Sequence, residues 1–285
     1  TDPWAPAPSP THTRGTPSPT HGRTHVDTEG VLDVIRDVAA RIITPRFRAL
    51  TDAQVDQKRP GDYVTVADRE SEAELGRLLT GAYPDAVIVG EEAVFDDPDV
   101  VRLLHTHPHV FVVDPVDGTR NFVHGSPDHA VIVAEIRDGE PVRGWIHQPA
   151  HGVSYVVERG AGVWRDGVRL VPARPTGRPH GWSSISRVVG LESPLLGAPV
   201  APTRFCCGID YPLLLTGATG FLAYGPPKPW DHVAATLMLR ELGGVARTTD
   251  GDDYRPTSTG PALIAALDAE TWDAADRALG DRIRR

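Results

Sequence analysis

The most constraining feature of this sequence is a short apolar run that leads directly into two closely spaced carboxylates. The run Val110–Val113 is β-branched apart from one Phe, which predicts a buried strand. Asp114 and Asp117 follow it, and Pro115 between them restricts how far the two carboxylates can swing. Carboxylate oxygens of this kind suit Mg²⁺. A tight acidic turn that binds nothing is the alternative interpretation of this segment.

The next two residues favour the binding of a phosphate beside the metal. Gly118 allows the backbone to approach a ligand closely. Thr119 and the amides after it predict a helix start, where the positive end of the helix dipole attracts anions. Phosphate oxygens can complete the octahedral coordination of a magnesium ion. We therefore predict a combined metal and phosphate site at the end of this strand.

Two further acidic clusters also stand beside apolar runs. Gly90-Glu91-Glu92 follows the predicted strand 86–89, and carboxylates just past a buried strand lie at a sheet edge, often beside a cleft. Pro229-Trp230-Asp231 opens a predicted helix that Gly243-Gly244 ends. Taken singly, the first cluster fits a charged turn and Asp231 fits a helix cap.

Composition excludes several classes of function. The chain has 285 residues, 40% apolar and 24% charged, as in an ordinary globular protein. Its net charge of −9 argues against nucleic-acid binding. No apolar run is long enough for a membrane span, and no secretory signal is expected. Cys206 and Cys207 are too few for a zinc site by themselves and fit buried thiols in a reducing cytoplasm.

The chain divides into a tail and a mixed α/β region. Residues 1–27 are rich in Pro and Thr and are predicted to be disordered. A first helix, which Thr28 is expected to cap, runs towards Pro45, and a second begins near Thr65. Further helices are expected near 210–215, 231–242 and 269–279. Strands are expected at 86–89, 110–113, 130–136, 143–147, 154–158 and 263–266.

The three acidic clusters, in this order, resemble the inositol monophosphatase family of lithium-sensitive, metal-dependent phosphatases. The matching motifs are G-E-E at 90–92, D-P-V-D-G-T-R-N-F at 114–122 and W-D at 230–231, with D-Y-V-T-V-A-D upstream at 62–68. The resemblance covers roughly residues 29–280. It implies a mixed, layered αβαβα sandwich of the inositol monophosphatase/fructose-1,6-bisphosphatase type over residues 28–285. Within it, 28–180 would form a metal-binding subdomain and 181–285 a C-terminal one.

Site roles follow from the resemblance alone. It implies that two to three Mg²⁺ ions bind, with a third, weaker ion near Glu91 and Asp68. The first ion would be held by Glu91, Asp114 and the Val116 carbonyl, and the second by Asp114, Asp117 and Asp231. The amides of Gly118 and Thr119 would hold the phosphate, and Thr119 with Asp68 would orient and deprotonate the attacking water. Glu91 would take part in catalysis as a metal ligand.

The substrate side departs from the pattern of inositol-hydrolysing members. Tyr224 stands where they carry a Glu that contacts ring hydroxyls, and Asp210 stands where they usually carry a small residue. A tyrosine cannot accept hydrogen bonds as a carboxylate does. The expected substrate contacts are Asp117, Asp210, Tyr224 and Asp231, although Asp210 also fits a helix-capping role. Inositol-phosphate-like esters, histidinol phosphate and nucleotide 3′-phosphates all remain candidate substrates.

Several further expectations come with these interpretations. The family resemblance implies a homodimer that acts on a small phosphorylated metabolite, and the cysteines favour a cytoplasmic location. A non-catalytic regulatory binding protein is the alternative from another class. His105, His107 and His109 are expected in an exposed loop. Lys58 and Arg59 are expected in a solvated basic turn, with a loop that covers the metal site as the alternative.

Overall fold

The computed structural model describes residues 27–174 and 176–284. The predicted tail lies outside the described residues except for Asp27. Asp27, and not Thr28 as predicted, caps the first helix, because its side chain accepts a hydrogen bond from the Gly30 amide at 2.8 Å. No helix in the described part of the chain has both the length and the apolar character that a bilayer crossing needs.

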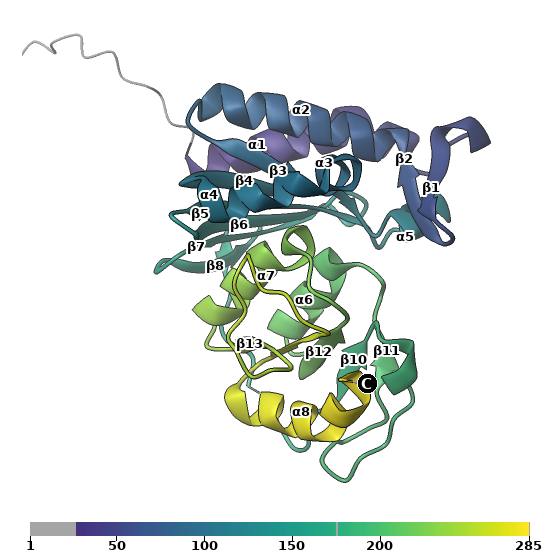
Figure 1. Cartoon of the computed structure of the whole chain (residues 1–285), viewed down its shortest axis with the longest axis vertical. Coiled ribbons are helices and arrows are strands. Elements are labelled where there is room, and N and C mark those ends of the chain that lie inside the picture. Colours follow the sequence, from purple (N-terminus) through teal and green to yellow (C-terminus); the bar gives the residue numbers. More distant parts are fainter. Residues whose placement is uncertain (1–26, 175, 285) are drawn as a thin grey trace, which may run out of the picture.

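Helices and strands mix along the chain, and β5 to β11 follow one another without an α-helix between them (Figure 1). The helices are α1 (Thr28–Val38), α2 (Val66–Ala82), α3 (Glu91–Asp96), α4 (Leu103–Thr106), α5 (Thr119–Val123), α6 (Cys207–Leu215), α7 (Pro229–Glu241) and α8 (Ala269–Ile283). The strands are β1 (Val55–Arg59), β2 (Asp62–Thr65), β3 (Val87–Gly90), β4 (His109–Asp117), β5 (Ala130–Arg137), β6 (Glu140–Gln148), β7 (Val153–Glu158), β8 (Gly162–Arg165), β9 (Val168–Arg169), β10 (Gly181–Ser183), β11 (Ala201–Pro202), β12 (Phe221–Tyr224), β13 (Val245–Thr248) and β14 (Leu263–Ala266).

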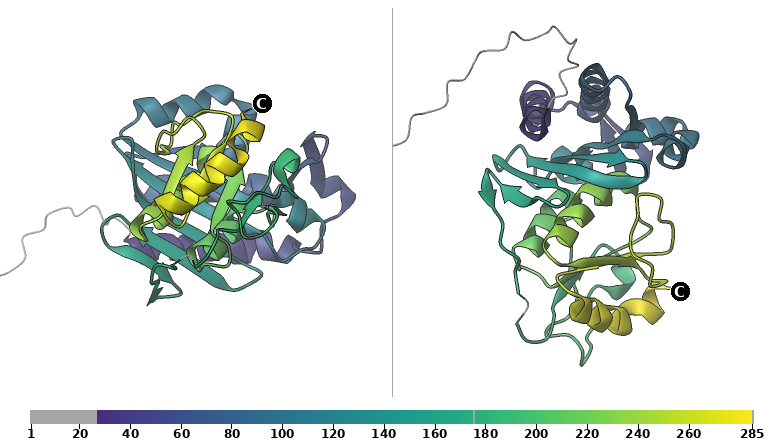
Figure 2. Two further views of the ribbon diagram at one scale, coloured as in Figure 1. Left: turned by 90° about the horizontal axis from the view of Figure 1, so that it is seen from below. Right: turned by 90° about the vertical axis from the view of Figure 1, so that its left-hand side faces the viewer.

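Five layers stack along the long axis of the molecule (Figures 1 and 2). Helices α1 and α2 cover one face of a seven-stranded sheet of order β3-β4-β5-β6-β7-β8-β9. Helices α6 and α7 lie between this sheet and a five-stranded sheet of order β11-β10-β12-β14-β13. Helix α8 covers the outer face of the second sheet. The predicted αβαβα sandwich is therefore confirmed.

The central layer is apolar because both of its faces meet a sheet. Nearly every residue of α7 is buried, including Val233, Leu237 and Met238, as expected of a helix that is enclosed on all sides. Gly144 of β6 lies so close to α7 that an added Cβ would come within 2.9 Å of the Ala234 Cα. This close approach fixes α7, and with it Asp231, against the seven-stranded sheet.

The predicted strands and helices are found near their expected positions, with informative differences. Strand β4 continues through the acidic motif to Asp117, with a register irregularity between Asp114 and Asp117 where Pro115 interrupts the ladder. The hairpin of β1 and β2 was not predicted, because its residues are mostly polar. His109 was expected in an exposed loop but is buried at the start of β4, between Asp85 and Glu135.

Candidate active site

Asp114 lies at the centre of the site as a buried carboxylate that lacks a full set of partners. It is 2% exposed, and its Oδ1 has no hydrogen-bond partner. Burial raises its pKa well above the ordinary value, and the charges of Glu91, Asp117 and Asp231 raise it further. A buried polar atom without a partner is costly in a folded protein. This oxygen therefore marks a place where a ligand would be stabilising.

Asp117 faces the first turn of α6. Its Oδ2 accepts hydrogen bonds from the Gly208 amide at 2.5 Å and from the Cys206 thiol at 3.0 Å. Burial raises the pKa of Asp117 to about 6, and these two donors oppose that rise. The contacts join the end of β4 to the start of α6, two segments far apart in the sequence.

The turn after Asp117 requires a glycine. Gly118 has a φ of 79°, in the left-handed region, and a Cβ there would lie 2.9 Å from the Asp128 carbonyl oxygen. Asn121 closes the same turn by donating to the carbonyls of Asp128 and Arg204, each at 2.8 Å. The amides of the turn thus lie in a rigid loop next to the segment that precedes α6.

Thr119 and Asp68 form the predicted pair from two distant segments. Thr119 Oγ1 lies 3.0 Å from Asp68 Oδ1 and 2.9 Å from the Val116 carbonyl oxygen. Asp68 also accepts from the amide and hydroxyl of Thr65 in the capping box that begins α2. Burial raises the pKa of Asp68 to about 7 despite these hydrogen bonds. Such a carboxylate is suited to accept a proton near neutral pH.

Glu91 is held at the start of α3 by a network that the sequence did not reveal. The Glu72 carboxylate accepts from the amides of Glu92 and Ala93 at 2.9 and 2.8 Å, and so fixes the helix start. Gly90 is required because a Cβ there would lie 2.2 Å from the Glu72 carboxyl carbon. The expected solvated turn at Lys58 is wrong, because its ammonium is buried and lies 3.1 Å from Glu91 and 2.6 Å from Glu92.

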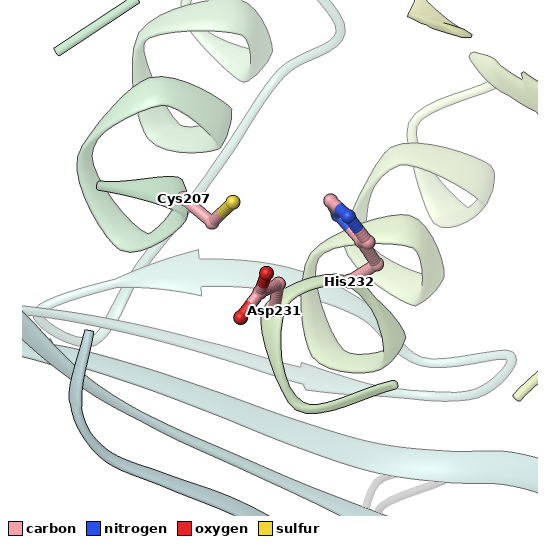
Figure 3. A group of neighbouring side chains, drawn as sticks. All are labelled: Cys207, Asp231 and His232. Atoms are coloured by element: carbon pink, nitrogen blue, oxygen red, sulfur yellow. The ribbon is translucent and has the colours of Figure 1, made fainter. Parts of the chain in front are cut away.

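Asp231 lies in the first turn of α7, where its backbone is positioned by the packing of that helix. Burial raises its pKa to about 8, and the positive charge of Lys228 opposes the rise. The charges of Glu91 and Asp117 add to the rise, so Asp231 lies close to the other acids of the site. Figure 3 shows Asp231 beside Cys207 of α6 and His232 of α7. These three side chains each bring one ligand atom within 4.8 Å of the others.

Asp210 and Tyr224, two of the four predicted substrate contacts, are buried. Asp210 has no exposed surface, and its oxygens accept from the Arg204 amide at 2.8 Å and from the Tyr224 hydroxyl at 3.2 Å. Tyr224 is 7% exposed and packs between Tyr211 and His232. These contacts favour a role in positioning α6 over the direct substrate contact that we predicted. Asp210 is not the helix cap either, since Cys206 occupies that position.

A hollow of about 280 Å³ opens beside this cluster and is lined by Glu91, Trp230, Lys58, Lys228 and Asp62, among others. In the described part of the chain, Cys207, Asp231 and His232 each bring one potential ligand atom within 4.8 Å of the others. No three of the predicted carboxylates there bring their oxygens this close together. Lys58 holds Glu91, and the α6 amide and thiol hold Asp117. The acids are nevertheless close enough to raise one another's pKa values.

The donor set fits divalent cations that prefer oxygen ligands. A cation bound between the buried acids would give Oδ1 of Asp114 a partner and would offset the mutual repulsion of the carboxylates. The glycine turn at Gly118 and the Asp68 carboxylate, whose pKa is raised, belong to the same site. Together, the αβαβα fold and these carboxylates define a metal-dependent phosphatase.

Comparisons with known proteins identify the family. The profile of the inositol monophosphatase family matches residues 27–280, so the chain belongs to this family, whose members use Mg²⁺. It is a phosphomonoesterase of that family. An inositol-1-monophosphatase of Mesorhizobium japonicum is 32% identical over 232 residues, which cover 75% of this chain and 82% of the relative.

Two further relatives bear on substrate and fold. A histidinol-phosphatase of Chlorobaculum parvum is 30% identical over 236 residues, covering 76% of this chain and 83% of the relative. The solved structure of a Thermotoga maritima inositol monophosphatase superposes with a TM-score of 0.74 at 21% identity, covering 89% of this chain and 96% of that one. The fold and the family are thus shown, whereas the relatives differ in the substrate that their names give.

Several residues that hold the site in position were not predicted from the sequence. Cys206 and Gly208 contact the predicted site residue Asp117, and Glu72 accepts from the amide of Glu92, the residue after Glu91. For Glu72 a signal existed, because an acid on the apolar face of the second predicted helix must be buried with a partner. No sequence signal identified Cys206 and Gly208, because only the fold brings the start of α6 next to β4.

Proposed function

We propose that this protein hydrolyses a small, inositol-phosphate-like phosphate monoester with the help of Mg²⁺, by direct attack of water on phosphorus. The observation that carries the proposal is the unpartnered Oδ1 of Asp114 among carboxylates that repel one another. A cation and a phosphate supply what this cluster lacks. Because water attacks directly, no covalent enzyme intermediate forms.

The residues that would hold the metal are those of the acidic cluster. Glu91, Asp114 and the Val116 carbonyl would bind one ion, and Asp114, Asp117 and Asp231 a second. When bound, Mg²⁺ supplies an activated water and charge stabilisation at the leaving oxygen. Lys58 already neutralises Glu91 and Glu92, so we propose two firmly bound ions, and a third only where Glu91 exchanges this ammonium for a metal.

The chain's own groups position the phosphate and the proton. The amides of Gly118 and Thr119 donate to the phosphate from a loop that Asn121 holds rigid. Thr119 Oγ1 passes the proton of the attacking water to Asp68, which lies 3.0 Å away. Asp117 and Asp231 also border the leaving group, while Asp210 and Tyr224 position α6 behind it.

A second candidate substrate class is favoured by an exposed aromatic side chain. Phe205 is 53% exposed and has a φ of 57°, which is unusual for a bulky residue. It directly precedes Cys206, which contacts Asp117, and the Arg120 guanidinium lies 5.9 Å from the centre of its ring. A planar leaving group, as in histidinol phosphate or a nucleotide 3′-phosphate, could stack on this ring.

Further properties belong to the same proposal. Family resemblance supports a lithium-sensitive homodimer, with residues 28–180 carrying most metal ligands and residues 181–285 completing the substrate side. The two free, buried cysteines support a cytoplasmic location. The retained acidic cluster argues against a purely regulatory binding protein, because such a protein has no need of repelling buried acids.

Phosphate release tests the proposal. The full chain is assayed with inositol 1-phosphate, histidinol phosphate, adenosine 3′-phosphate and glycerol 2-phosphate, with Mg²⁺ and with a chelator. We expect Mg²⁺-dependent release from at least one ester, and incorporation of ¹⁸O from labelled water into phosphate. Equal release with and without Mg²⁺, or none from any ester, would overturn it.

A further inference from the structure

Two potential ligands beside the acidic cluster have no part in the phosphatase chemistry. The Cys207 thiol is 7% exposed at the start of α6, and His232 is 2% exposed in the first turns of α7. Each contributes a ligand atom to the group within 4.8 Å that Asp231 completes. Figure 3 shows the sulfur of Cys207 and the ring of His232 on the same side of Asp231.

We propose that Cys207, Asp231 and His232 form a binding site for a thiophilic divalent cation of the Zn²⁺ or Cd²⁺ class. Sulfur and imidazole ligands select such cations, whereas Mg²⁺ prefers six oxygen ligands. Three protein ligands leave a fourth tetrahedral position for water or a substrate oxygen. The metal–sulfur bond forms as the Cys207 thiol releases its proton to solvent, without any oxidation or reduction.

The surroundings of the two new ligands support this assignment. Nδ1 of His232 lies 3.1 Å from the Tyr211 hydroxyl, while its Nε2 has no partner among the described residues. Metal-binding histidines in proteins usually use their second ring nitrogen in this way, because the bond fixes the tautomer and orients the ring. The two adjacent cysteines are too few for a zinc site by themselves, but the fold brings Asp231 and His232 to Cys207.

Asp231 belongs to both the proposed magnesium site and this one. A thiophilic cation at Cys207 and His232 therefore withdraws Asp231 from Mg²⁺ and inhibits phosphate release. This inhibition rests on the proposed function, but the binding of the cation does not. The site gives the protein a way to be inhibited by Zn²⁺ while Mg²⁺ is abundant.

Cd²⁺ titration of the full chain, followed by the ultraviolet absorption of the cadmium–thiolate bond, tests the site. We expect a saturable band in the wild type, no band in Cys207→Ser, and an affinity lowered at least about tenfold in His232→Asn. The matched control is Cys206→Ser, since Cys206 is the neighbouring buried thiol and contacts Asp117 instead. Thermal unfolding of each variant establishes that it is folded.

The outcomes separate this proposal from the proposed function. A band of equal size in wild type and Cys207→Ser, or one lost only in Cys206→Ser, would overturn the site. With inositol 1-phosphate and Mg²⁺, added Zn²⁺ should inhibit the wild type and spare Cys207→Ser. If no ester is hydrolysed but the Cd²⁺ band behaves as expected, the proposed function fails and the cation site stands.

Discussion

Two buried aspartates of this protein have opposite surroundings. Asp114, at the end of β4, has an oxygen without a partner and lies among acids that raise its pKa. Asp210, in α6, has both oxygens bonded to protein donors. Both side chains are almost completely buried. A buried acid with an oxygen that lacks a hydrogen-bond partner indicates a ligand, whereas a buried acid with both oxygens bonded stabilises the fold.

The largest expected effect comes from replacing the unpartnered acid. Asp114→Asn should lower kcat/KM at least about 1,000-fold, because the metals that stabilise the transition state lose a shared ligand. Steady-state kinetics with the best ester of the panel measures this. Asp210→Asn is the matched control and should lose less than about tenfold, since its neighbours bond equally well to an amide. Equal losses in the two variants would remove the distinction between the two acids.

A smaller effect is expected at the proton acceptor pair. Thr119→Val keeps the shape of the side chain but cannot pass a proton to Asp68, so kcat should fall about 100-fold. Thr119→Ser restores the hydroxyl and should recover most of the rate. If Thr119→Val retains the wild-type kcat, the hydroxyl has no role in proton transfer.

A third effect is expected on substrate preference when the ring of Phe205 is removed. Phe205→Asn tolerates the left-handed backbone and removes the ring, so the preference for a planar over an aliphatic leaving group should fall about tenfold. The ratio of kcat/KM for histidinol phosphate to that for glycerol 2-phosphate measures the preference. Phe205→Tyr keeps the ring and should preserve the ratio. An unchanged ratio in Phe205→Asn would leave inositol-phosphate-like esters as the better candidates.

The smallest effect concerns stability and pH. Burial raises the pKa of Asp210 to about 7, and the charge of Asp117 adds to the rise. The folded state therefore binds this proton more tightly than the unfolded state, so the contribution to stability is present below about pH 4 and is lost as the pH rises through about 7. In Asp210→Asn, Tm should fall less between about pH 5 and about pH 8 than in the wild type. Parallel Tm curves for the two proteins would show that Asp210 ionises normally.

Local patterns in the sequence predicted much of this fold and singled out carboxylates that the structure brings close together. The strand before Asp114, the capped helix at Thr65 and the αβαβα sandwich are all found in the structure. The first two depend on neighbouring residues, and apolar periodicity is strong there. The layered sandwich came from the family motifs and not from the pattern itself.

What could not be predicted depends on contacts between distant segments. The sequence around Lys58 predicts a solvated basic turn, but the β1–β2 hairpin places its ammonium against Glu91 and Glu92. The hydrogen bonds that Asp210 accepts from Arg204 and Tyr224 could not be predicted either. Cys207 and His232 come together only because α6 and α7 pack in one layer. Sequence periodicity carries no information about such pairs.

Calorimetric titration with Mg²⁺ in the presence of phosphate tests most directly whether the unpartnered acid marks a cation site. We expect saturable binding of at least two ions by the wild type and by Asp210→Asn, and weakened binding with fewer ions in Asp114→Asn. Binding to Asp114→Asn with wild-type affinity and stoichiometry would contradict the account.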